Sequence, residues 1–232
     1  MVFSQPMPPA RRSTNTTPTL QALDGVPDGP DPEFARVLRM ADPGSALEGP
    51  LTFAPSPAAV VSAPDWLAAW HGWREDIFAR RLVPAMLAAA DHAERGQARE
   101  LIALGASLHA ALEPQASARS RQAGGRLLRR LGTARGERWI AKLLAADADG
   151  TALAHFPVIY AAQSSLFHLP LRLLLPGYAY WEWVTAAHAH PPTRGSLPPF
   201  ADEAADLHRT NGQLLSSRDH AAPDPFAACG GA

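Results

Sequence analysis

The apolar and aromatic positions of this sequence are most concentrated between residues 153 and 189. From residue 150 to residue 171 the chain carries no Asp, Glu, Lys or Arg, and about 20 apolar residues suffice to span a bilayer. His155, Gln163 and His168 interrupt this run, however, and polar side chains are costly in hydrocarbon. A segment that is apolar on nearly all sides, with small and polar residues among the apolar ones, is typical of the central helix of a soluble bundle. The pattern therefore predicts a buried helix that begins near Leu153.

Helical periodicity predicts the elements on either side of this centre. Ser62 is the expected N-cap of a long helix, with Pro64 and Asp65 in its first turn. Within that helix apolar side chains recur at helical spacing, and Pro84 is expected to kink or divide it. The helices expected around it cover residues 32–41, 97–112, 115–131, 137–146, 169–175, 178–187 and 202–217, with an interruption at Pro176-Gly177. Loops are expected over 45–57 and 191–199.

Composition supports one all-α domain, a helical bundle of about 8–10 helices over residues 31–217. Ala and Leu are frequent and β-branched residues are sparse, which favours helix. Residues 1–30 are rich in Pro, Thr and Ser, and we expect this leader to be disordered, as is the tail at 218–232.

Charge and cysteine content narrow the function class. The net charge of −1 gives no reason to expect a nucleic-acid or membrane partner. Cys229 is the only cysteine, which excludes a disulfide framework and fits a reducing compartment. The N-terminus lacks the apolar core of a signal peptide, so we expect a cytoplasmic protein.

Candidate chemistry is sparse. His188 and His190, or His155 with His168, could suggest a metal, but no acidic or Cys ligand lies near them in sequence, and a structural or solvated role is favoured. Glu182 is the only carboxylate of the apolar centre and is interpreted as a helix-surface residue. No nucleophile motif and no phosphate-binding glycine loop occurs. We expect no catalytic residue, no bound metal and no stably bound cofactor.

Two further patterns allow more than one interpretation. Trp66, Trp70 and Trp73 recur on one helix face and are more often core than interface. The arginines between residues 119 and 130 could contact an acidic partner, although a solvated helix face is favoured.

Several short stretches, in the right order over about residues 33–217, resemble the UreF family of urease accessory proteins. They are Leu38-Arg-Met-Ala-Asp42, Asp65-Trp-Leu-Ala-Ala-Trp70, Ser120-Arg-Gln-Ala-Gly124 followed by Arg126-Leu-Leu-Arg129, His155-Phe-Pro-Val158 and Thr210-Asn-Gly-Gln-Leu-Leu215. The chain departs from the family pattern at residues 43–57, where PGSALEGPLTFAPSP replaces a Gly- and Ser-containing segment, and an insertion precedes the last motif at 191–207.

The resemblance implies a UreF-like all-α fold, commonly dimeric, and a non-catalytic chaperone. Such a protein joins UreD (also called UreH) and the GTPase UreG to the apo-urease subunits during nickel insertion. Carried over by position, Ser120, Gly124, His155 and Pro157 are expected to be structural. The expected partner-binding residues are Arg121, Gln122, Thr210, Asn211, Gly212 and Gln213.

Two other hypotheses remain open at this point. The protein could be an all-α enzyme or ligand-binding protein whose pocket lies between the central helices, with His155 or Glu182 as acid or base. It could also be a helical adaptor unrelated to urease. An enclosed pocket would favour the first alternative.

Overall fold

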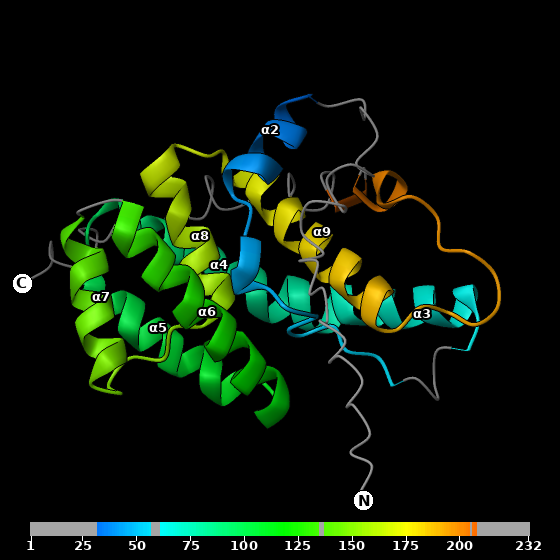
Figure 1. The fold of residues 1–232 in the computed structure, drawn as a ribbon, viewed down its shortest axis with the longest axis horizontal. Helices are drawn as coiled ribbons and strands as arrows, with labels where there is room; N and C mark the ends of the chain where they lie inside the picture. The colour runs from blue at the N-terminus through cyan, green and yellow to red at the C-terminus, as the bar shows by residue number, and fades with distance from the viewer. Residues whose placement is uncertain (1–31, 57–60, 135–136, 205, 208–232) are drawn as a thin grey trace, which may run out of the picture.

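A computed structural model describes residues 32–56, 61–134, 137–204 and 206–207. Its elements in chain order are α2 (Pro32–Met40), η1 (Gly44–Ala46), α3 (Ala63–Trp73), η2 (Arg74–Leu82), α4 (Val83–Glu94), α5 (Ala98–Ala111), α6 (Pro114–Ala134), α7 (Arg138–Ala148), α8 (Phe156–Phe167) and α9 (Leu171–Ala189). In the described part of the chain the only β-pairing is an isolated bridge between Ser62 and Arg194. The predicted all-α class is confirmed (Figure 1). The predicted leader and tail lie outside the described residues.

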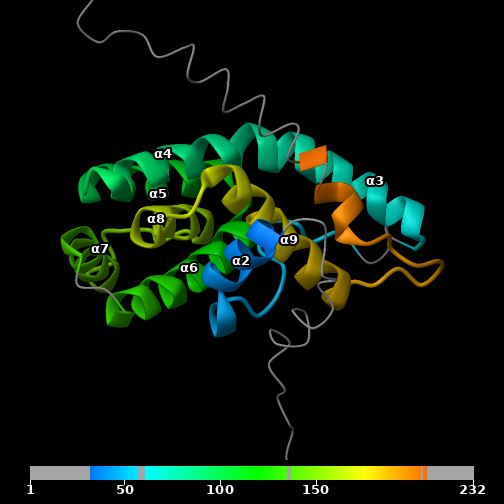
Figure 2. The ribbon, with the colours of Figure 1, turned by 90° about the horizontal axis from the view of Figure 1, so that it is seen from above.

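Helix α8 is the centre of the bundle, as the apolar run predicts. It lies between α4 and α6 and also contacts α5 and α9 (Figure 2). All but two of its residues are buried, including the polar Gln163 and Ser164. The helix begins at Phe156 rather than near Leu153, because His155 is still extended and serves as the N-cap. No helix in the described ranges is both long and apolar enough to cross a membrane.

The helices α3, η2 and α4 form one continuous, arched rod along one side of the molecule (Figure 2). It begins as predicted at Ser62, which forms a capping box with Asp65. Pro84 neither breaks nor divides the rod. The segment before it, η2, is a π-helix in which the Val83 N–H donates to the Phe78 carbonyl. Its wider turn accommodates a proline ring that would clash with the carbonyl four residues earlier in an α-helix.

Pro176 and Gly177 do not interrupt α9, contrary to the prediction. The helix runs through both residues, which are buried. A Cβ on Gly177 would lie 2.9 Å from the Tyr160 hydroxyl and 3.4 Å from Leu38 Cδ2. The absence of a side chain therefore lets α2 and α8 approach this point. Tertiary packing offsets the roughly 3 kcal/mol that an internal proline costs a helix.

The tryptophans of α3 belong to the core, as predicted. Trp66, Trp70 and Trp73 are all buried. The Trp183 ring of α9 lies edge-on to Trp66 and Trp70, with ring centroids 4.6 and 5.0 Å apart. Phe53 lies edge-on to the same two rings, at 5.0 and 5.2 Å. This aromatic cluster joins three segments that are far apart in the sequence.

The helix predicted over 202–217 begins two residues earlier, at Phe200. It is described at residues 200–204 and 206–207. Phe200, Ala204 and Leu207 are buried against the bundle. The remainder of that predicted helix lies outside the described residues. The expected loops at 45–57 and 191–199 are irregular where they are described, apart from the short η1.

Candidate functional site

Two of the short stretches that carry the family resemblance lie against each other. Ser120 and Gly124, one turn apart on α6, face the backbone that enters α8. The Phe156 N–H donates to Ser120 Oγ at 3.2 Å. A Cβ on Gly124 would lie 1.9 Å from the Ala154 carbonyl oxygen and 2.6 Å from the Phe156 nitrogen. Only glycine permits this approach, and the serine hydroxyl satisfies a helix N-terminal N–H that has no intrahelical partner.

His155 is fully buried beside this contact. Its Nδ1 lies within hydrogen-bonding distance of Ser120 Oγ, at 3.2 Å, and the same oxygen accepts from Phe156 N–H. Burial, with His109 and Arg121 nearby, lowers the pKa of His155 to about 4. The ring is therefore neutral at pH 7. Pro157 is buried in the first turn of α8, where its missing N–H costs no hydrogen bond.

The two residues after Ser120 are placed differently. Arg121 and Gln122 are exposed on the outer face of α6. The residues expected to be structural are therefore buried, whereas Arg121 and Gln122, which are expected to bind a partner, are accessible. Thr210, Asn211, Gly212 and Gln213 lie outside the described residues.

Three of the five arginines of α6, Arg121, Arg129 and Arg130, are exposed, as the favoured interpretation of a solvated face expects. Four of the five nevertheless also bind other parts of the chain. Arg119 Nε donates to the Leu51 carbonyl at 3.1 Å. Arg126 pairs with Glu48 at 2.5 Å, and Arg130 donates to the Asp42 carbonyl. These three positions are i, i+7 and i+11, which places them on one side of the helix. They contact residues 42–51, which overlap the segment at 43–57 that departs from the family pattern.

Glu182 is not on the helix surface, contrary to the prediction. Its side chain is 2 % exposed and accepts hydrogen bonds from the backbone N–H groups of Leu51, Thr52 and Phe53 at 3.0–3.3 Å. The Thr52 and Tyr178 hydroxyls donate to it at 2.7 and 2.8 Å. Burial raises the pKa of Tyr178 well above its usual value, so this phenol stays protonated and donates.

The Glu182 carboxylate therefore fixes the backbone of residues 51–53, next to the segment that the α6 arginines contact. Both of its oxygens accept hydrogen bonds from the chain itself, which argues against the acid–base role of the alternative hypothesis. Sequence reasoning missed this anchor because its partners are about 130 positions away. The available signal was a carboxylate flanked by Trp181 and Trp183 in an apolar helix, which must be paired if it is buried.

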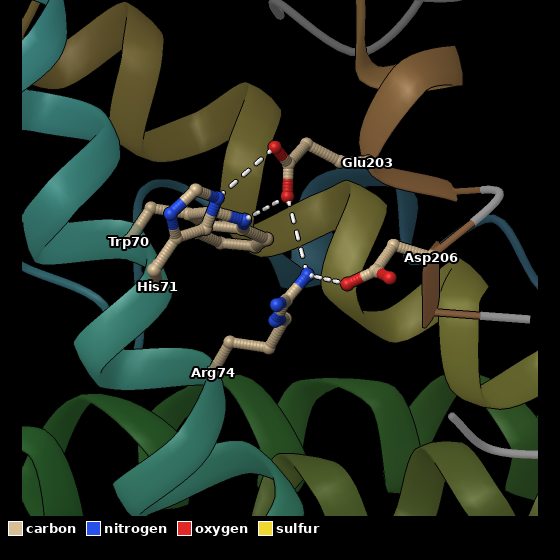
Figure 3. Close-up of polar contacts among 5 residues, drawn as sticks. All are labelled: Trp70, His71, Arg74, Glu203 and Asp206. Atoms are coloured by element: carbon tan, nitrogen blue, oxygen red, sulfur yellow. Dashed lines mark hydrogen bonds and ion pairs between the residues drawn. The ribbon is translucent and has the colours of Figure 1, made fainter. Parts of the chain in front are cut away.

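A second carboxylate, Glu203, holds the described helical residues at 200–204 and 206–207 (Figure 3). Glu203 accepts a hydrogen bond from Trp70 Nε1 at 3.0 Å and lies 3.2 Å from His71 Nε2. Arg74, at the start of η2, lies 3.5 Å from Glu203 and 2.5 Å from Asp206. This cluster fixes the point on the bundle from which the chain continues to residues 210–215.

Two surface pockets accompany these features. One of about 300 Å³ lies between residues 46–54 and α6, and Gln122 lines it. A broader one of about 990 Å³ lies among the ends of α4, α7 and α8, with the exposed Glu94, Arg95 and His168 in its wall. Neither is an enclosed cavity between the central helices, where the alternative hypothesis places its pocket.

The histidine pairs considered as metal ligands, His188 with His190 and His155 with His168, are not joined by further metal-ligating side chains in the described residues. In the part of the chain that the structure describes, no group of three or more His, Cys, Asp or Glu residues could hold a metal ion. His188 and His168 are exposed, and the His190 carbonyl accepts a hydrogen bond from Trp66 Nε1 at 3.1 Å.

Comparison with known proteins gives one match. The family model described as UreF matches residues 61–217, which is more than half of the chain. No curated protein and no solved structure matches. The matched range contains both stretches that meet at Ser120 and His155, and it begins after the divergent segment at 43–57.

Proposed function

Because the chain belongs to the UreF family of urease accessory proteins, we propose that it is a non-catalytic scaffold for urease maturation. In this role it joins UreD/UreH and the GTPase UreG to the apo-urease subunits. Nickel is the cargo of the complex and not a cofactor of this chain. We propose that the protein works in the cytoplasm as a homodimer.

The family match over residues 61–217 carries this proposal. The packing of Ser120 and Gly124 against the start of α8 supports it, because a single contact explains why both motifs carry the residues that they do. The saturated carboxylate of Glu182 and the neutral, buried His155 also support a non-catalytic role. Neither group is poised to transfer a proton to a ligand.

We place the partner contacts at two sites. The first is the outer face of α6 at Arg121 and Gln122, which are exposed on a rigid helix. The second is the motif at 210–215, which begins just after the segment that Glu203 ties to Trp70 and Arg74. A fixed starting point reduces the conformational entropy lost when such a segment binds a partner.

Co-expression with the cognate UreD/UreH tests the proposal. Affinity pull-down and size-exclusion chromatography should show a complex, which UreG then joins. A chain truncated after Phe200 should lose co-elution. Arg121→Ala should weaken it, whereas Lys142→Ala, which removes another exposed cation, on α7, should not.

A folded chain that binds neither partner would overturn the proposal. If the truncated chain or Arg121→Ala bound as well as the intact protein, the scaffold role would stand but the contact sites would be wrong. Far-UV circular dichroism of each variant distinguishes loss of contact from loss of fold.

A further inference from the structure

The pocket of about 300 Å³ is built from a loop and a helix that are held together by polar contacts. Residues 46–54 form one wall, and the arginine-bearing side of α6 forms the other. Four residues whose side chains carry nitrogen atoms line it, namely Arg119, Gln122, Arg126 and His190. A single carboxylate, Glu48, lies among them. The pocket is therefore rich in donors and carries net positive charge.

Arg119 is held in place before any ligand arrives. Its Nε donates to the Leu51 carbonyl at 3.1 Å, and the backbone around Leu51 is itself fixed by Glu182. One donor of the guanidinium is thus used for positioning, while the group lines the pocket. A guanidinium offers five N–H donors in a planar fork, so most of its capacity is left for an oxyanion.

Arg126 is already paired with the carboxylate of Glu48, but a carboxylate from another molecule can replace it. Its Nη1 lies 2.5 Å from Glu48 Oε1, and the Glu48 side chain is 70 % exposed, against 27 % for Arg126. An ion pair with so exposed a partner contributes little to stability, so an incoming carboxylate can replace Glu48 at small cost.

We propose that this pocket binds an acidic side chain from a docking protein. The incoming carboxylate displaces Glu48 from Arg126 and gains Arg119 and the Gln122 amide as further partners. Charge complementarity and arginine geometry favour a carboxylate, and the volume is at the small end of ligand sites, with room for a side chain. The inference rests on this pocket alone and does not require that the docking protein serves urease.

Isothermal titration of the full chain with a blocked tetraglutamate peptide tests the proposal, with blocked tetraglutamine and inorganic phosphate as parallel titrants. We expect saturable binding of tetraglutamate only. Arg126→Gln should weaken it about tenfold, the loss expected for one charged hydrogen-bond partner. Glu48→Gln should strengthen it, because the competing carboxylate is gone. Arg129→Gln, a cation on the same helix that pairs with Asp147 outside the pocket, should change affinity less than twofold.

The gain from Glu48→Gln keeps the test valid even if Arg126→Gln disturbs the loop. Equal losses from Arg126→Gln and Arg129→Gln would indicate non-specific attraction and overturn the proposal, as would the absence of saturable binding. If phosphate bound as tightly as tetraglutamate, the proposal of an acidic protein side chain would be wrong, and the pocket would be a site for small oxyanions. Failure of the urease-maturation proposal would leave all these outcomes unchanged.

Discussion

Ser120 and Gly124 stand one helical turn apart in α6 and make different contributions to one contact. The serine hydroxyl accepts from Phe156 N–H and orients His155, while the glycine lets the backbone at 154–156 touch the helix. Both effects depend on a few atoms, so single substitutions test them. Glu182 is a third residue of this kind, because one carboxylate accepts from three successive backbone N–H groups.

Gly124→Ala should destabilise the protein by about 1–3 kcal/mol, because its Cβ would overlap the Ala154 carbonyl and the helices would have to separate. Gly125→Ala is the matched control. Its Cβ would find its nearest neighbour at 3.4 Å, and the gain in helix propensity is about 1 kcal/mol. Urea unfolding of both variants should therefore give shifts of opposite sign. A Gly124→Ala variant as stable as the parent would contradict the close approach.

Glu182→Gln should cost about 2–3 kcal/mol, because the amide NH₂ would face backbone N–H groups that then lack an acceptor. Tyr178→Phe removes one donor to the same carboxylate and should cost about 1 kcal/mol. Urea unfolding measures both, and limited proteolysis should show faster cleavage near residues 51–53 in Glu182→Gln only. Equal effects of the two substitutions would contradict the anchoring role of the carboxylate.

His155 predicts a pH dependence. Its pKa is lowered to about 4 in the folded chain, against about 6.5 when unfolded, so the unfolded state binds the extra proton first. The stability contributed by the neutral ring is present above pH 6.5 and is lost as the pH falls towards 4. Relative to His155→Asn, the parent should lose up to about 2 kcal/mol between pH 7 and pH 5. A pH-independent difference in unfolding free energy between the two proteins would contradict this.

At the scale of elements, helix ends and loops are held by side chains from distant parts of the chain. Residues 42–53 are held between the α6 arginines and Glu182. Residues 200–204 and 206–207 are held on α3 and η2 through Glu203 and Asp206 (Figure 3). Irregular segments thereby become fixed surfaces on a helical frame.

Glu203→Ala should loosen residues 200–207 without unfolding the bundle, because Trp70 Nε1 and Arg74 lose a shared acceptor while the aromatic core is intact. Hydrogen–deuterium exchange should rise at 200–207 and stay constant in α8. Asp202→Ala, one position away and exposed, should change neither. Increased exchange in α8 would show instead that Glu203 supports the whole core.

At the scale of the molecule, one hydrophobic core runs through the described helices. It extends from the aromatic cluster of α3 and α9, through α8, to Trp139 and Ile140 on α7. All six tryptophans are buried in it. A continuous core of this size makes the bundle a single cooperative unit.

We therefore expect one unfolding transition. In the parent, tryptophan fluorescence and far-UV circular dichroism should give the same urea midpoint. In Trp139→Phe, whose fluorescence reports only on the tryptophans of α3 and α9, the two probes should again agree with each other. The midpoint of the variant itself is expected to fall, because a large buried side chain is reduced. Fluorescence and circular-dichroism midpoints that separate within either protein would indicate that α7 unfolds independently.

Much of this fold follows from the sequence by itself. The helix class, the N-cap at Ser62, the tryptophan face of α3 and the central position of α8 depend on periodicity and on neighbours within a few residues, which the sequence contains directly. The short motifs, taken together in their order along the chain, also indicate the UreF family, which the family match confirms.

Only the tertiary structure decided the rest. The continuity of the helices through Pro84 and Pro176, the burial of Glu182 and the partners of the α6 arginines all depend on segments from distant parts of the chain. A prediction from local sequence includes the free-energy cost of a proline in a helix or of a buried charge. It does not include the packing and hydrogen bonds from distant segments that offset this cost. Those partners meet only when the chain folds, and for that reason the sequence placed Glu182 on the surface and the structure placed it in the core.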